Sequence, residues 1–184
     1  DGSKDSKWTW YHINGPIRKE RTFKDKTRDG KWTIYHENSQ LIGEGSYKDK
    51  KIDGETTYYY NNGNLKERCS YKNGRKDGKH TWYYINGDLK EEENFKNGTG
   101  KWTWFHENGQ IRNEINFKDG TLDGELTSFY KYGQIKKKGE FNDGSRDGEW
   151  TFYHFNGQIK KEGKFKDGKE EGEWNYYNKN GQKI

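Results

Sequence analysis

The sequence contains no alanine, valine or methionine, and it has one proline and one cysteine. Because small aliphatic side chains fill the gaps between packed layers, their absence argues against a conventional layered core. The single cysteine, Cys69, excludes an internal disulfide. No segment approaches the roughly 18 consecutive apolar residues that suggest a membrane-spanning helix, so no transmembrane segment is predicted.

Aromatic and charged side chains take the place of small aliphatic ones. Hydrophobic residues make up 26% of the chain and aromatic residues 17%, against 35% charged residues. Disordered chains are poor in aromatic residues, so we expect an ordered architecture of an unusual kind. The net charge is +5, from 35 basic and 30 acidic residues, with no run of five like charges. Neither a nucleic-acid-binding arm nor a polybasic membrane segment is supported.

One sequence unit recurs along the chain, which indicates a repeat architecture. The glycine of an N-G-type turn returns every 24 residues, apart from one step of 22. These glycines are Gly15, Gly63, Gly87, Gly109, Gly133, Gly157 and Gly181, and Ser39 fills the remaining position. We therefore expect a single repeat array over residues 1–184, with units beginning near residues 6, 30, 54, 78, 100, 124, 148 and 172.

Each unit reads roughly D-G-K/E-W-T-x-Y-H-x-N-G-Q-I-K-x-E-x-x-F-K-D-G-x-x. Two runs rich in Thr, Tyr, Trp, Phe and Ile alternate with Gly, Asn and Asp turns, and no helical period is present. The pattern predicts an all-β fold, a single-layer antiparallel meander of about eight stacked β-hairpins and about fifteen strands. Successive hairpins advance by two strands, about 9.6 Å, so the meander is expected to be elongated and open-ended.

The form of the N-G turn decides which side chains share a face. A two-residue turn would place His12 opposite Ile17, whereas a three-residue turn with a G1 bulge would place Tyr11 opposite Ile17. We favour the second form, because it pairs the least variable positions in a ladder of aromatic and aliphatic side chains. The one short step falls in the segment 96–100, where we expect a two-residue deletion to shorten a turn and leave both strands intact.

Residues 150–168, WTFYHFNGQIKKEGKFKDG, resemble a MORN repeat (membrane occupation and recognition nexus) of the bacterial variant class, and the resemblance covers the whole chain. It implies an elongated, twisted antiparallel sheet of stacked hairpins that acts as a scaffold or interaction module. Some bacterial members are described as antitoxin components. The eukaryotic relatives are named for membrane association, but no matching lipid site is recognisable here, so membrane contact is not expected.

No residue pattern points to catalysis, a metal or a cofactor. His12, His36, His106 and His154 share one repeat position, and neighbours in that row lie at least about 9.6 Å apart, too far to share one zinc ion. Cys69 has no unique histidine partner, and the acidic pairs all recur with the repeat. The glycine loops precede no helix and are not phosphate cradles. We therefore predict a protein that is not an enzyme.

The tryptophans are the strongest candidates for a binding surface. Two positions on the first strand of each hairpin lie two residues apart and so share a face. They hold Trp8, Trp32, Trp102, Trp150 and Trp174 in the first position and Trp10, Trp82 and Trp104 in the second. An exposed row could stack on sugar rings or on a partner's apolar surface. Alternatively, sheet twist and long Lys and Arg stems cover it. Nucleic acid is not expected, because glutamates balance the lysines.

Both ends of the sequence look cut within the array, so we expect part of a longer or processed protein. The strands around Trp8–Tyr11 and Trp174–Tyr177 would then be open edges, which invite pairing with another chain. The sequence favours a non-enzymatic scaffold for protein–protein interaction or self-assembly, with a secreted or cell-surface location slightly favoured over a cytoplasmic one. The alternatives are a glycan-binding module that uses the tryptophan row and an antitoxin or inhibitor of a partner protein.

Overall fold

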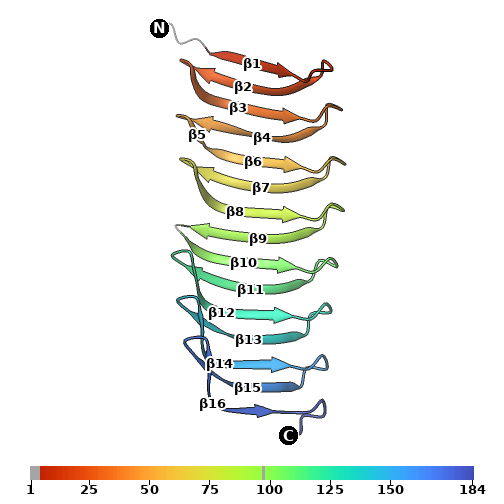
Figure 1. The fold of residues 1–184 in the computed structure, drawn as a ribbon, viewed down its shortest axis with the longest axis vertical. Helices are drawn as coiled ribbons and strands as arrows, with labels where there is room; N and C mark the ends of the chain where they lie inside the picture. The colour runs from red at the N-terminus through yellow and green to blue at the C-terminus, as the bar shows by residue number, and fades with distance from the viewer. Residues whose placement is uncertain (1–4, 97) are drawn as a thin grey trace. The chain divides into compact units, whose positions relative to one another are not determined.

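The computed structural model describes residues 5–96 and 98–184, and strands are the only extended regular elements in these ranges (Figure 1). The chain divides into two compact units, Asp1–Leu89 and Lys90–Ile184. The first unit holds β1 (Ser6–Tyr11), β2 (Ile17–Lys24), β3 (Thr27–Tyr35), β4 (Leu41–Lys48), β5 (Lys51–Ile52), β6 (Gly54–Tyr59), β7 (Leu65–Lys72) and β8 (Arg75–Tyr83). The second unit holds β9 (Leu89–Lys96), which begins at the boundary, β10 (Thr99–Phe105), β11 (Ile111–Lys118), β12 (Thr121–Phe129), β13 (Ile135–Asn142), β14 (Ser145–Tyr153), β15 (Ile159–Lys166) and β16 (Lys169–Tyr176).

Within each unit, strands that follow one another in the sequence pair side by side. All the pairings are antiparallel, and the strand order follows the chain, with only the short β5 placed off this path beside β4. A meander of this kind needs only tight turns, because antiparallel neighbours can be joined by a hairpin. The predicted all-β meander of hairpin repeats is therefore confirmed.

The turns that close the hairpins have three residues and a bulge. In the first hairpin Tyr11 lies opposite Ile17, and the His12 amide donates to the Pro16 carbonyl at 2.8 Å. Gly15 takes a φ of 104°, a region that glycine occupies without strain. The same pairing recurs at Tyr35–Leu41, Tyr59–Leu65, Phe105–Ile111, Phe129–Ile135 and Tyr153–Ile159. The favoured turn form and the ladder of aromatic and aliphatic pairs are both confirmed.

The turns that join one hairpin to the next have two residues. Asp25 and Lys26 have φ values of 47° and 62°, as the type I′ turn requires. Asn or Asp followed by Gly fills these two positions in most other repeats, and this dipeptide adopts that turn with least strain. The expectation that the first residues of the sequence lie within the array falls partly on residues 1–4, which lie outside the described residues.

In most repeats, the first strand of the hairpin has two more residues than are required to pair with the preceding strand. Between β13 and β14, Lys138 lies opposite Thr151, whereas Glu140 lies opposite Asp147, so the two-residue step on β13 faces a four-residue step on β14. Gly148 takes a positive φ of 70° within this bulge. The D-G pair of the repeat therefore marks an irregular stretch of strand.

The short repeat lacks this irregularity. The register of β9 and β10 runs without a shift from Lys96 opposite Thr99 to Glu91 opposite Trp104, and β10 has 7 residues where β14 has 9. The prediction that the deletion shortens a turn is therefore wrong, because the two missing residues are those of the bulge. Asn97, within the segment predicted to change, lies outside the described residues.

The buried interior is thin, and aromatic rings fill it by lying directly on backbone. Trp150 is fully buried, and a Cβ added at Gly139 would lie only 2.2 Å from its ring. Phe141 and Phe165 meet the Trp150 ring edge-on, with centroids 5.5 and 5.7 Å away. The Trp150 ring thus packs against the backbone at Gly139 in the neighbouring strand. In a conventional core, side chains of a second layer would occupy this place.

Candidate functional site

The eight candidate tryptophans differ widely in burial. Trp150 is 0% and Trp32 is 5% exposed, whereas Trp8 on β1 is 57% exposed. The remaining members are half-buried, namely Trp10, Trp82, Trp102, Trp104 and Trp174. Over the described residues they therefore form no continuous solvent-exposed row.

Long cationic side chains lie over several of these rings. The Arg146 guanidinium lies 5.0 Å and the Lys137 ammonium 6.0 Å from the Trp150 ring centroid. The Lys161 ammonium lies 4.4 Å from the Trp174 ring, and the Lys19 ammonium lies 4.2 Å from the Trp10 ring. Such contacts are favourable electrostatically and cover the indole with an apolar stem. Cover of the tryptophan rings by Lys and Arg side chains was the alternative to an exposed row that the sequence left open.

The histidine position of the repeat fastens one hairpin to the next. His106 Nε2 donates to the Phe129 carbonyl at 3.2 Å, and the Tyr130 hydroxyl, in the same position one repeat on, donates to the Tyr153 carbonyl at 2.9 Å. The same bond joins His12 to Tyr35, Tyr60 to Tyr83 and His154 to Tyr177. Tyrosine and histidine thus make the same bond at this position, although His36 Nε2 has no hydrogen-bond partner among the described residues. Among the described residues no three His, Cys, Asp or Glu side chains are grouped to hold a metal ion.

The asparagine of the N-G turn makes a second link between hairpins. Asn108 donates through Nδ2 to the Lys131 carbonyl at 2.7 Å, while its Oδ1 accepts from the Gln110 amide at 3.3 Å. Asn62 and Asn156 make the equivalent bonds to Ile85 and Lys179. The polar residues that repeat most regularly thus satisfy backbone groups and hold the stack of turns.

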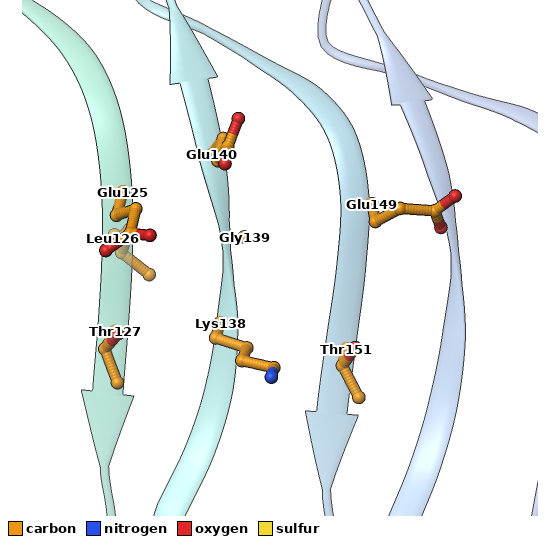
Figure 2. Close-up of a pocket in the computed structure, with 8 residues that line it drawn as sticks. All are labelled: Glu125, Leu126, Thr127, Lys138, Gly139, Glu140, Glu149 and Thr151. Carbon is orange, nitrogen blue, oxygen red and sulfur yellow. The ribbon is translucent and has the colours of Figure 1, made fainter.

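The face opposite the tryptophans carries threonines and charged side chains. A depression of about 370 Å³ lies on this face. Figure 2 shows Lys138 of β13 between Thr127 of β12 and Thr151 of β14. A similar depression of about 200 Å³ in the first unit is lined by Thr33, Glu44 and Thr57, among others. Pairs such as Lys7–Glu20, Lys101–Glu114 and Lys164–Glu149 lie within ion-pair distance. This is a solvated surface of mutually neutralising charges, and exposed pairs of this kind contribute little to stability.

A depression of about 530 Å³ in the second unit has a different character. Arg112, Lys136, Lys137 and Lys160 line it together with aromatic rings that include Phe152, and the described residues that line it include no carboxylate. The sequence-based reasoning missed this site, because it treated the lysines as half of a balanced ladder. The signal was available in the second strand of three successive hairpins, where a basic residue directly follows Ile111, Ile135 and Ile159.

Six segments of the chain match the family model described as MORN repeat variant, namely residues 28–49, 52–73, 76–97, 99–119, 122–143 and 146–167. The chain belongs to this family. No curated protein matches it. A solved structure, the crystal structure of a GtfA/B complex bound to UDP and GlcNAc, is 13% identical over 76% of this chain and 24% of that chain, with a TM-score of 0.21. This chain therefore matches about a quarter of the length of that one.

Membership of the MORN repeat variant family sets the class of function. MORN repeats are generally modules for interaction with proteins or membranes, and they are typically not enzymes. The helix-free structure of the described residues offers no helix that could cross a membrane.

Proposed function

We propose that this MORN repeat chain is a non-enzymatic scaffold that mediates protein–protein interaction, including self-assembly, through an edge strand. The repeated polar positions support the absence of catalysis, because their side chains satisfy backbone groups of neighbouring turns. His106 and Asn108 both donate to main-chain carbonyls of the following repeat. A side chain engaged in this way is held in place by the fold and is not poised to react.

The observation that carries the proposal is the edge of β1. Among the described strands β1 pairs with β2 alone, and we propose that its other side receives a further strand. Trp8 and Tyr11 on this edge strand are 57% and 62% exposed. An unpaired strand edge is a template for the addition of another strand, and exposed aromatic side chains supply apolar contact for it. We expect the partner to present a β-strand, either from a second copy or from another protein.

Light scattering coupled to size exclusion tests the proposal. Wild type is expected to form oligomers at both about 50 mM and about 500 mM salt, because backbone pairing and apolar contact are not screened as exposed charge pairs are. The variant W8K/Y11K places two charges on the edge and is expected to be monomeric. The control I13K/I85K adds the same charge at two exposed turn residues and should assemble like wild type. A strict monomer for wild type at both salt concentrations would contradict assembly through this edge.

A further inference from the structure

The cationic depression of the second unit has the features of a binding site for an anion. Ser128, Lys137 and Phe152 lie side by side across β12, β13 and β14 and line the depression, which measures about 530 Å³. Arg112 and Lys160 complete its basic wall. We name these residues, with Lys136, the basic groove.

The cations of the basic groove lack carboxylate partners within the described residues. On β15, which also carries Lys160, the ion pairs are made by Lys161, Lys164 and Lys166. Burial lowers the pKa of Lys137 from its usual 10.5, and the positive charges of Arg146 and Lys136 lower it further. Like charges gathered without a counter-ion are unfavourable in the empty protein. A bound anion would relieve this repulsion.

A buried hydroxyl group gives independent support. Ser128 is 2% exposed and lines the groove, and its Oγ has no hydrogen-bond partner in the part of the chain that the structure describes. Buried polar groups are nearly always hydrogen-bonded, so this oxygen lacks a donor or acceptor that a ligand could supply. The equivalent position on β14 is Phe152, which has no polar group to satisfy.

An exposed aromatic pair adjoins the groove. Tyr130, which lines it, contacts Phe155 edge-on with ring centroids 5.4 Å apart, and Phe155 contacts Tyr132 at 6.2 Å. Tyr132 and Phe155 are 66% and 53% exposed. Tyr132 departs from the repeat, since asparagine stands in its position in every other hairpin turn, whereas Phe155 stands at a variable position. Exposed rings beside cations suit a ligand that has both apolar faces and negative charges.

The spacing of the cations indicates the chemistry of the ligand. Arg112, Lys136 and Lys160 hold one repeat position on β11, β13 and β15, so they recur about every 9.6 Å. A linear carbohydrate with an acidic group on every second sugar presents charges at a comparable interval on a chain of rings with apolar faces. We propose that the basic groove, together with Tyr132 and Phe155, binds an acidic polysaccharide of this kind.

An extended acidic peptide fits the groove less well. Carboxylates about 10 Å apart on a strand would be three residues apart, and alternate side chains of a strand point to opposite faces. Every second acidic group of the peptide would therefore point away from the groove. The proposal is independent of the edge-strand scaffold, because β1 contributes nothing to the site.

Calorimetric titration with two oligosaccharides of equal length tests the proposal. One alternates glucuronate with N-acetylglucosamine, and the other contains N-acetylglucosamine alone. We expect wild type to bind the acidic compound at low salt and the uncharged one far more weakly. The variant R112Q/K136Q/K160Q should bind the acidic compound about tenfold or more weakly. The control R18Q/K66Q/K90Q removes three charges from the same repeat position in other hairpins and should bind like wild type.

Two further measurements complete the test. The variant Y132N/F155N places in both turns a residue that other repeats hold there, as Asn61 does for Phe155, so it should keep the thermal stability of wild type and lose affinity. Equal affinity of the two triple variants, or unchanged affinity of Y132N/F155N, would overturn the proposal. Tighter binding of an oligoglutamate than of the acidic oligosaccharide would also overturn it, in favour of an acidic peptide.

Discussion

At the scale of single residues, part of the variation in the repeat is compensated between neighbouring strands. Gly139 lies beneath Trp150, and Gly163 lies beneath Trp174, where a Cβ would meet the ring at 2.2 and 2.5 Å respectively. Where the glycine position holds Cys69, the tryptophan position opposite it holds His80, and Ile115 lies opposite Leu126. The exceptions are Trp32, which lies opposite Arg21, and Trp102, which lies opposite Glu93. At the compensated positions a larger residue in one strand is accompanied by a smaller one in the next, as close packing requires.

This compensation predicts the behaviour of His80. Both His80 and Cys69 are 2% exposed, so H80W should overpack the site and lower the free energy of unfolding by about 1–3 kcal/mol, even though it restores the usual residue of the repeat. The double variant C69G/H80W should recover most of the loss, because it recreates the arrangement of Gly139 and Trp150. Urea unfolding measures both. A destabilised double variant with no coupling between the two changes would show that the positions are independent.

The basic groove predicts a dependence of stability on pH. The folded chain holds Lys137 with a pKa below the usual 10.5, mainly through burial, so its charged form destabilises the fold at neutral pH. As the pH rises through the folded pKa toward 10.5, the folded state loses its proton before the unfolded state does, and this destabilisation disappears. We therefore expect K137Q to be more stable than wild type at pH 7, with the difference narrowing at alkaline pH.

Chemical unfolding at several pH values measures this difference for K137Q. The matched control is K138Q, which removes the same charge from an exposed position on the opposite face. If K137Q and K138Q shift the free energy of unfolding equally at every pH, the environment of Lys137 has no special effect.

At the scale of the hairpin, the sequence was sufficient to predict the three-residue turns but not the bulges in the strands. Gly15 in the N-G turn required a positive φ, and the register of Tyr11 with Ile17 followed from that turn. The bulge around Gly148 could not be predicted, because a D-G pair is an equally good signal for a turn. Only the pairing of whole strands decides between the two, and that depends on contacts that a local pattern does not contain.

The links between hairpins predict that histidine and tyrosine are interchangeable at their shared position. H106F removes the donor to the Phe129 carbonyl and should cost about 1–3 kcal/mol of unfolding free energy, because a part-buried carbonyl loses its partner. H106Y should retain most of the stability, since Tyr130 makes the equivalent bond one repeat later. Thermal unfolding of the three proteins measures this. Equal stability of H106F and wild type would show that the bond contributes nothing.

At the scale of the whole molecule, folding and the proposed recognition use different residues of the repeat. Trp150 and His106 contact neighbouring strands and turns and build the fold, whereas Tyr132 and Phe155 form the exposed surface beside the basic groove. The sequence predicted the first group because periodicity reveals it. It did not predict the second, because the basic residues after Ile111, Ile135 and Ile159 recur with the repeat and the aromatic rings beside them are identified only when neighbouring turns are placed side by side.

The tryptophans are interpreted here as part of the folded sheet, so they should not form a row that is exposed to solvent along its length. Iodide quenching of tryptophan fluorescence tests this interpretation directly, because iodide reaches only exposed indoles. Of the eight tryptophans, Trp8 is exposed while Trp32 and Trp150 are buried. Because exposed and buried indoles are mixed, we expect a downward-curving quenching plot for wild type and a marked loss of quenching in W8F. A straight plot with every tryptophan quenched alike, unchanged in W8F, would contradict this interpretation.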